Sequence, residues 1–219
     1  MPDERTLDPR DTRQVVIAGW TGRDQAALEA HIRELEALGI ARPKTTPIFY
    51  RVAASLLTTG ETIEVIGGDS SGEAECVVYA LADGMWLGLG SDHTDRKAEA
   101  IGVTLSKQMC AKPVAPLLWR FSEVAPHWEK LTLRSYVTRA GKRRLYQEGP
   151  VTTMRPPGEL IRLYAGGSEL SPGTAMFCGT LAVHGGIEGG ELFEMELEDP
   201  VLGRKLTHAY SVEQLPVEG

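Results

Sequence analysis

Cysteine is scarce in this sequence, and its placement excludes two kinds of site. The 219 residues contain three cysteines, Cys76, Cys110 and Cys178, widely spaced and without a Cys-x-x-Cys pair. Disulfide frameworks use even numbers of cysteines, and structural zinc sites use closely spaced ligands. The sequence therefore predicts neither a disulfide framework nor a zinc site. Cysteines kept free are typical of a reducing compartment, so we expect a cytoplasmic protein.

Long hydrophobic runs and a surplus of positive charge are also missing. No stretch approaches the ~20 apolar residues of a membrane-spanning helix. The first apolar run, residues 15–18, is too short for the core of a secretory signal. Lys and Arg number 23 against 30 Asp and Glu, so the net charge is −7. Because nucleic acids and anionic membranes need a positive field, we expect neither as a partner.

What the chain does contain favours one compact β-rich domain. Hydrophobic residues make up 42% of the sequence, enough for a sizeable core, and its 24 glycines suit a fold with many turns. Residues 1–13 are polar and are predicted to be a loosely held tail. Residues 14–219 hold no linker long enough to divide them, so they are predicted to form a single domain.

The local patterns predict an α+β fold class. Residues 14–19 are typical of a short buried strand. Thr21 and Asp24 resemble a helix cap, which predicts a helix to about Leu38 with Gly39 as its stop. From residue 62 onward, short β-type runs alternate with glycine-containing turns. We expect a mixed β-sheet with a few short helices.

Three acidic residues are the strongest functional signal. Glu73 and Glu75 are separated by one residue, and side chains two apart on a strand share a face. Asp83-Gly84 lies between two β-type runs and predicts a tight hairpin turn. With that turn, Asp92 lies directly opposite Glu75 on the same face, where opposed Cβ atoms are ~4.5–5.5 Å apart.

Carboxylates gathered in this way repel one another unless protons or a cation offset their charge. Ligation by oxygen alone favours Mg²⁺, Mn²⁺ or Ca²⁺ over zinc. Two alternatives stay open from the residues themselves. Glu73 and Glu75 are also compatible with a solvated strand face, and Gly88 or Gly90 is compatible with a bulge that shifts the pairing by one residue.

At these residues the sequence resembles the fumarylacetoacetate hydrolase superfamily, whose members carry a Glu-x-Glu strand followed by an Asn-Asp-x-Ser-x-Arg segment. Glu73-Ala74-Glu75 and the segment Ser91 to Arg96 are similar to these two motifs. Leu105-Ser106-Lys107 is similar to the family's lysine segment. Further similar segments follow the family order: Gly19-Trp20, Pro47 to Arg51, Gln147-Glu148-Gly149, Phe177 to Thr180, and Gly189 to Gly203.

The sequence departs from the family pattern at three places. Ser91 replaces the asparagine that precedes the ligand aspartate, and the excursion between the acidic motifs is shortened to a hairpin. The catalytic histidine of the family aligns near Gln25, whereas His31 and Glu34 reproduce its His-x-x-Glu spacing a few residues later. This shift leaves the identity of the general base open.

The resemblance implies a β-rich mixed-sheet roll, a homodimer, and a metal site made by Glu73, Glu75 and Asp92 that holds Mg²⁺ (or Mn²⁺ or Ca²⁺). It implies catalytic roles for His31, Glu34, Lys107 and Arg96, and substrate contacts for Thr180, Arg51 and Gln147. His31 and Glu34, at i and i+3 of a helix, would activate water. Lys107 and Arg96 would supply positive charge to carboxylate or enolate oxygens.

The implied activity is that of a divalent-metal-dependent hydrolase or lyase that breaks a C–C bond. Its substrate would be a small dicarbonyl or 2-oxo or 3-oxo carboxylic acid, reacting through a metal-stabilised enolate. Decarboxylation, tautomerisation and hydration would use the same site. A non-catalytic protein that binds a metal or a small ligand is the alternative from a different class, and a structural β-protein is a third.

Overall fold

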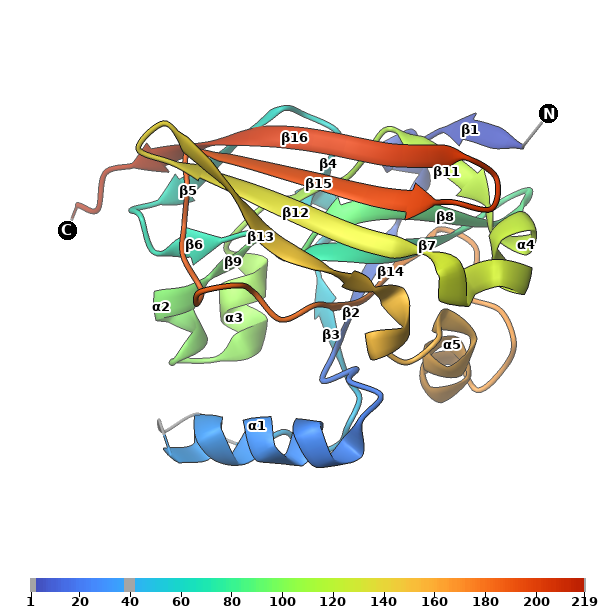
Figure 1. Ribbon diagram of the computed structural model, residues 1–219, viewed down its shortest axis with the longest axis horizontal. Coiled ribbons are helices and arrows are strands. Elements are labelled where there is room, and N and C mark those ends of the chain that lie inside the picture. Colours follow the sequence, from blue (N-terminus) through green and yellow to red (C-terminus); the bar gives the residue numbers. More distant parts are fainter. Residues whose placement is uncertain (1–2, 38–41, 219) are drawn as a thin grey trace.

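Two large β-sheets lie one over the other and form most of the molecule (Figure 1). The computed structural model describes residues 3–37 and 42–218. In spatial order, the seven-stranded sheet contains β1 (Glu4–Thr6), β11 (Leu117–Arg120), β8 (Gly84–Ser91), β7 (Ala74–Leu81), β14 (Thr174–Thr180), β2 (Gln14–Gly19) and β3 (Ile48–Val52). The five-stranded sheet contains β13 (Lys142–Pro150), β12 (Thr132–Arg139), β15 (Leu192–Asp199), β16 (Arg204–Leu215) and β5 (Thr62–Ile66).

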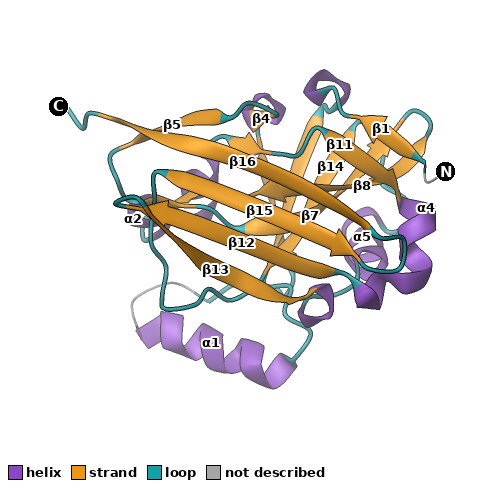
Figure 2. Ribbon diagram, turned by 45° about the horizontal axis from the view of Figure 1, so that its top comes forward, coloured by secondary structure: helices purple, strands orange, loops and turns teal. Residues whose placement is uncertain are grey.

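Short strand pairs and helices surround the two sheets (Figure 2). The two small pairs are β10 (Lys112–Pro113) with β4 (Leu57–Thr58), and β6 (Ser70–Ser71) with β9 (Thr94–Asp95). The α-helices are α1 (Gln25–Ala37), α2 (Arg96–Glu99), α3 (Val103–Gln108), α4 (Phe121–Val124) and α5 (Pro157–Ala165). The 3₁₀ helices are η1 (Pro9–Asp11), η2 (Ala54–Leu56), η3 (Ala125–Lys130) and η4 (Val151–Thr153).

Both large sheets are mixed. β14 pairs in parallel with β2 and antiparallel with β7, and β16 pairs in parallel with β5 and antiparallel with β15. The prediction of an α+β fold with mixed sheets and few helices is therefore confirmed.

The main core lies between the sheets. Along β15, residues Phe193, Met195 and Leu197 are buried and alternate with partly exposed glutamates, as expected for a strand with one face against a core. All eight residues of β7 are buried, because the second face of its sheet is covered as well. That second face packs a smaller apolar cluster, which includes Val77 and Tyr79. β7 therefore runs through the interior with both faces buried.

The first residues of the chain differ from the loosely held tail that the sequence predicts. β1 pairs antiparallel with β11, and the Leu7 amide donates to the Pro116 carbonyl at 2.8 Å. Leu7 is 4% exposed, and the Arg5 guanidinium donates to Asp83 at 2.7 Å. The Leu7 side chain, the ion pairs of Arg5 with Asp83 and of Asp3 with Arg120, and the pairing of β1 hold this stretch to the sheet. These few contacts are too small a signal to stand out in a polar segment.

Helix α1 begins at Gln25, three residues later than a cap at Thr21 predicts, because Asp24 is its N-cap. The Asp24 carboxylate accepts hydrogen bonds from the amides of Ala26 and Ala27, at 2.9 and 3.1 Å. The predicted helix end at Leu38 and Gly39 lies outside the described residues. The three cysteines are buried and free, in agreement with the sequence. Among the described helices, none has the length and apolar content needed to cross a membrane.

Truncation of Leu133 tests whether the space between the sheets is the main core. Leu133 is 0% exposed on β12, so Leu133→Ala should lower the free energy of unfolding by ~2–5 kcal/mol. Leu163→Ala on α5, where the leucine is 54% exposed, should change it by less than ~0.5 kcal/mol. Urea denaturation measures both. Equal losses in the two variants would contradict the assignment of the core.

Candidate metal centre

The hairpin of β7 and β8 brings the three predicted ligands together, although in a register different from the predicted one. Leu81 pairs with Gly84, so the turn residues are Ala82 and Asp83, and Glu75 pairs with Gly90 rather than Asp92. Asp92 instead follows β8 opposite Glu73, and its amide donates to the Glu73 carbonyl at 3.0 Å. The predicted pairing of Glu75 with Asp92 is therefore wrong.

The turn is set one residue early by contacts of Asp83. Its carboxylate accepts from the Trp86 indole N–H at 3.0 Å and from Arg5 at 2.7 Å, and its carbonyl accepts from Arg120 at 2.8 Å. Gly84, with φ of 121°, begins the second strand in a conformation that favours glycine. The partner of each residue thus moves by two positions, which preserves the face on which every side chain lies.

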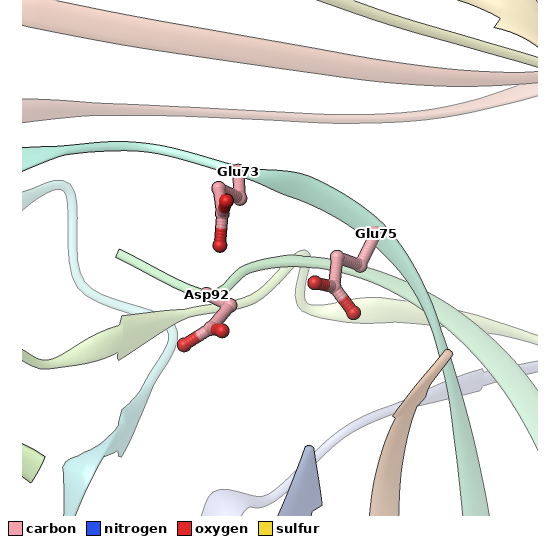
Figure 3. A group of neighbouring side chains, drawn as sticks. All are labelled: Glu73, Glu75 and Asp92. Atoms are coloured by element: carbon pink, nitrogen blue, oxygen red, sulfur yellow. The ribbon is translucent and has the colours of Figure 1, made fainter. Parts of the chain in front are cut away.

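Because the face is preserved, the carboxylates still converge (Figure 3). One oxygen from each of Glu73, Glu75 and Asp92 lies within 4.8 Å of the others. Glu75 and Asp92 are 2% and 0% exposed, and the Glu73 side chain is 18% exposed. Neither alternative left open by the sequence occurs: the pair is not a solvated face, and no bulge interrupts the ladder of β7 and β8.

Positively charged side chains surround the acidic group on one side. Arg96 Nη2 lies 3.1 Å from Glu73, and Lys107 forms an ion pair with Asp92 and lies 3.6 Å from Glu73. Lys112 Nζ lies 3.1 Å from Asp92 Oδ1. Burial raises the pKa of the Asp92 carboxyl, but the two lysine ammonium groups outweigh it and hold that pKa below its usual value.

Glu75 stands in a different electrostatic environment. Burial, followed by the charges of Asp92 and Glu73, raises the pKa of its carboxyl well above the usual value. Its Oε2 accepts a hydrogen bond from the Gly179 amide at 2.7 Å. Asp92 Oδ1 is buried and receives no hydrogen bond of good geometry, although Lys112 is near. Buried carboxylate oxygens that lack full compensation fit a hard divalent cation.

The β14 segment that supports Glu75 depends on a glycine. Gly179 has φ of +96°, and a Cβ at this position would lie 1.8 Å from Thr21 Oγ1. The ladder of β14 and β7 is irregular here, between Phe177 and Thr180. This irregularity turns the Gly179 amide toward Glu75. The segment Phe177 to Thr180, which is similar to a family segment, therefore holds a carboxylate of the acidic group.

Gln147 and Thr180, predicted to contact substrate, form hydrogen bonds that hold β7 in place. Gln147 is 0% exposed; its carbonyl oxygen accepts from the Ala74 amide and Ser135, and its amide group donates to Thr180 and the Leu181 carbonyl. Thr180 Oγ1 donates to the Ala74 carbonyl at 2.8 Å. Both polar groups of Ala74 are therefore fixed, which positions Glu73 and Glu75 on either side of it.

The structure brings some of the predicted catalytic residues to the centre and not others. Lys107 and Arg96 are there, but Arg96 also donates to Ser71 at 2.7 Å and to Glu99 at 3.1 Å, so its guanidinium is committed to protein partners. Arg51 is exposed, on the opposite face of β3 from Tyr50, whose ring lies 5.8 Å from Lys107 Nζ. Arg51 is therefore not brought to the acidic group.

His31 and Glu34 lie on helix α1, at the margin of the molecule in Figures 1 and 2, and their side chains are outside the described residues. The proposed base therefore stays a prediction.

The predicted set of site residues leaves out two buried residues near Asp92, His93 and Lys112. His93 Nδ1 lies 2.9 Å from the Tyr210 hydroxyl and Nε2 lies 2.9 Å from Ser70 Oγ. Burial lowers the pKa of His93 to about 3, so the ring is neutral. Tyr210 in turn donates to Ser91 Oγ at 2.8 Å, which ties the end of β8 to the five-stranded sheet.

Lys112 is the second residue left out, and it is 0% exposed. A signal for it was present, since it is the single charged residue in the otherwise apolar run 109–118.

Several solved structures are similar to this chain in fold. A candidate fumarylacetoacetate isomerase/hydrolase from Oleispira antarctica is 22% identical, with a TM-score of 0.66 over 94% of this chain and 95% of that one. A yeast fumarylacetoacetate hydrolase family protein is 18% identical, with a TM-score of 0.67 over 96% of each chain. A 2-keto-3-deoxy-D-arabinonate dehydratase, in complex with magnesium and 2,5-dioxopentanoate, is 18% identical, with a TM-score of 0.66 over 94% of this chain and 75% of that one.

The fold is that of the fumarylacetoacetate hydrolase family, so the resemblance carried by the sequence motifs is confirmed in the fold. The chain belongs to the family described as protein of unknown function (DUF2848), which matches residues 18–210. Among curated proteins, none matches the chain by sequence.

Replacement of Gln147 distinguishes a supporting role from a substrate contact. Gln147→Leu would leave the buried Ala74 amide and Ser135 hydroxyl without their acceptor, and each such group costs ~1–3 kcal/mol. We expect the free energy of unfolding to fall by about 2–4 kcal/mol in the absence of any ligand, measured by urea denaturation. Arg51→Ala, at an exposed position, serves as the control and should change it by less than ~0.5 kcal/mol. Unchanged stability in Gln147→Leu would favour the substrate contact instead.

Proposed function

We propose that this protein is a divalent-metal-dependent enzyme that acts on a small dicarbonyl or 2-oxo or 3-oxo carboxylic acid. The observation that carries the proposal is the convergence of Glu73, Glu75 and Asp92 within 4.8 Å in a largely buried site. Support comes from the fold shared with a dehydratase whose structure contains magnesium and 2,5-dioxopentanoate. When bound, Mg²⁺ or Mn²⁺ would act as a Lewis acid for carbonyl and carboxylate oxygens.

Residues around the acidic group would have two roles in this function: some hold the carboxylates in place, and Lys107 meets the substrate. Arg96 and the Gly179 amide hold Glu73 and Glu75 in place, at 3.1 and 2.7 Å. Lys107 is the cation best placed to meet an anionic substrate oxygen, because it approaches both Glu73 and Asp92 from helix α3. Its contact with Asp92 would loosen when a cation takes its share of that carboxylate. An ammonium group so placed favours negative charge that develops on a substrate oxygen.

His31 and Glu34 remain the proposed base pair. Residues at i and i+3 share one side of helix α1, so the glutamate can orient the imidazole for proton transfer. Hydrolytic or lyase cleavage of a C–C bond is the leading reaction. Decarboxylation, tautomerisation and hydration place the same demands on the acidic group and on Lys107.

A non-catalytic protein that binds a metal or a small ligand is the second candidate. The observation that favours it is Gln25, which stands where the family's catalytic histidine aligns and whose side-chain amide lies 3.4 Å from the Gly22 carbonyl. Such a protein would keep the acidic group and lose turnover. Homodimer formation, which the resemblance implies, is proposed for either candidate, and sedimentation equilibrium would test it.

Titration with Mg²⁺ and Mn²⁺ tests the metal centre. A cation that binds only the folded state stabilises it by ~2.7 kcal/mol at 100 times the Kd, so the melting temperature should rise and saturate. Glu75→Gln preserves the shape of the side chain and the acceptor for Gly179 but removes the charge, and it should abolish the shift. Glu64→Gln, at an exposed position of β5, is the matched control and should retain it. An unaltered shift in Glu75→Gln would place the cation elsewhere.

Steady-state assays with 2-oxo, 3-oxo and dicarbonyl acids in the presence of Mg²⁺ separate the two candidates. For an enzyme, His31→Ala should lower kcat by ~10²–10⁴-fold, as for other general bases, while the Mg²⁺-induced thermal shift persists. Lys107→Met should raise KM for the anionic substrate. A chain that binds Mg²⁺ but turns over none of these acids would favour the non-catalytic candidate.

A further inference from the structure

Lys112 occupies a place that the proposed chemistry does not explain. It begins the two-residue strand β10 and is 0% exposed, which is rare for a lysine. Its ammonium donates to the His93 carbonyl at 2.6 Å and lies 3.1 Å from Asp92 Oδ1. A side chain without exposed surface cannot reach a substrate. Whatever Lys112 does at this centre, it does through Asp92 and His93.

The charge balance of the centre shows what Lys112 adds. The acidic group contributes three carboxylates, and three cationic side chains lie within ion-pair distance of them: Arg96 and Lys107 at Glu73, and Lys107 and Lys112 at Asp92. The side chains of Arg96 and Lys107 are 18% and 8% exposed, so each keeps some surface that solvent or substrate can reach. Lys112, by contrast, is 0% exposed, and its ammonium group contacts the His93 carbonyl and Asp92.

Asp92 is therefore the ligand most affected. One of its oxygens faces Lys107 and the other faces Lys112. A divalent cation that binds Asp92 can displace Lys107, but it must share the carboxylate with Lys112. Two positive charges on one buried carboxylate repel each other strongly, since screening by water is weak in the interior.

We propose that Lys112 is a built-in counterion that weakens the affinity of the acidic group for divalent cations and keeps Asp92 in place when no cation is bound. The inference rests on the proposed metal centre. Lys112 is thus a positioning residue with an opposing electrostatic effect: it stabilises the metal-free fold and makes the bound cation easier to release.

Lys112→Met tests the proposal, because methionine nearly preserves the length of the side chain while it removes the charge. By isothermal titration calorimetry with Mg²⁺ and with Mn²⁺, the variant should bind at least about tenfold more tightly than the unmodified protein, a difference of ~1.4 kcal/mol. In the absence of a cation its melting temperature should fall, and the Mg²⁺-induced rise should be larger. Where Lys112→Met fails to fold, Lys112→Gln, which keeps a donor for the His93 carbonyl, should show the same tighter binding.

Lys97→Met is the matched control. It removes the same charge from an exposed position on helix α2, where solvent screens it, so the Kd for Mg²⁺ should change by less than about twofold. Glu75→Gln combined with Lys112→Met should bind neither cation, which ties the gain in affinity to the acidic group.

The outcomes separate this inference from the proposed function. If the unmodified protein binds Mg²⁺ and Lys112→Met binds it equally or less tightly, Lys112 has a merely structural or supporting role and the inference is overturned, while the metal centre stands. If neither protein binds a cation, both fall. If Lys112→Met binds Mg²⁺ measurably and the unmodified protein does so only weakly, both are supported.

Discussion

The mutual repulsion of three buried carboxylates is the constraint on which the rest of this structure depends. Glu75 and Asp92 are almost inaccessible to water, and Glu73 is largely so. Burial of charge is costly unless partners are supplied, and a fold that retains such a group must hold each member in place. Four groups hold the carboxylates in place: the amide of Gly179, the guanidinium of Arg96, and the ammonium groups of Lys107 and Lys112.

Buried polar side chains of the five-stranded sheet also help to hold the acidic residues in place. Gln147 reaches from β13 to both the Ala74 amide and the start of the segment after β14. Tyr210 reaches from β16 to Ser91 and His93. The five-stranded sheet therefore does more than cover an apolar face. Its buried polar side chains fix the ends of β7 and β8, where the acidic residues lie, and these polar networks are fully satisfied, as rigid supports must be.

The sequence was sufficient for the fold class and for the acidic group, because both depend on local patterns. Alternation around a tight turn identifies a hairpin, and a spacing of two identifies a shared face. The exact pairing was not accessible, since it is decided by Arg5 and Arg120, which come from distant strands and bind Asp83. The contacts by which Gln147 and Thr180 support β7 were not accessible for a similar reason: a motif shows that a polar residue is needed but not which partner it meets. Lys112 carried a signal, a lone charge within apolar residues, and its meaning required the position of Asp92.

The hairpin of β7 and β8 has a consequence for how relatives of this chain can diverge. The acidic residues lie at its open end, and the turn at Ala82 and Asp83 lies at the other. Residues added in equal number to both strands would lengthen the ribbon and leave Glu73 opposite Asp92, whereas an unequal addition would force a bulge or rotate one ligand to the wrong face. Length variation in this segment should therefore occur in even steps, with the contacts of Asp83 at the turn replaced by others that keep Glu73 opposite Asp92.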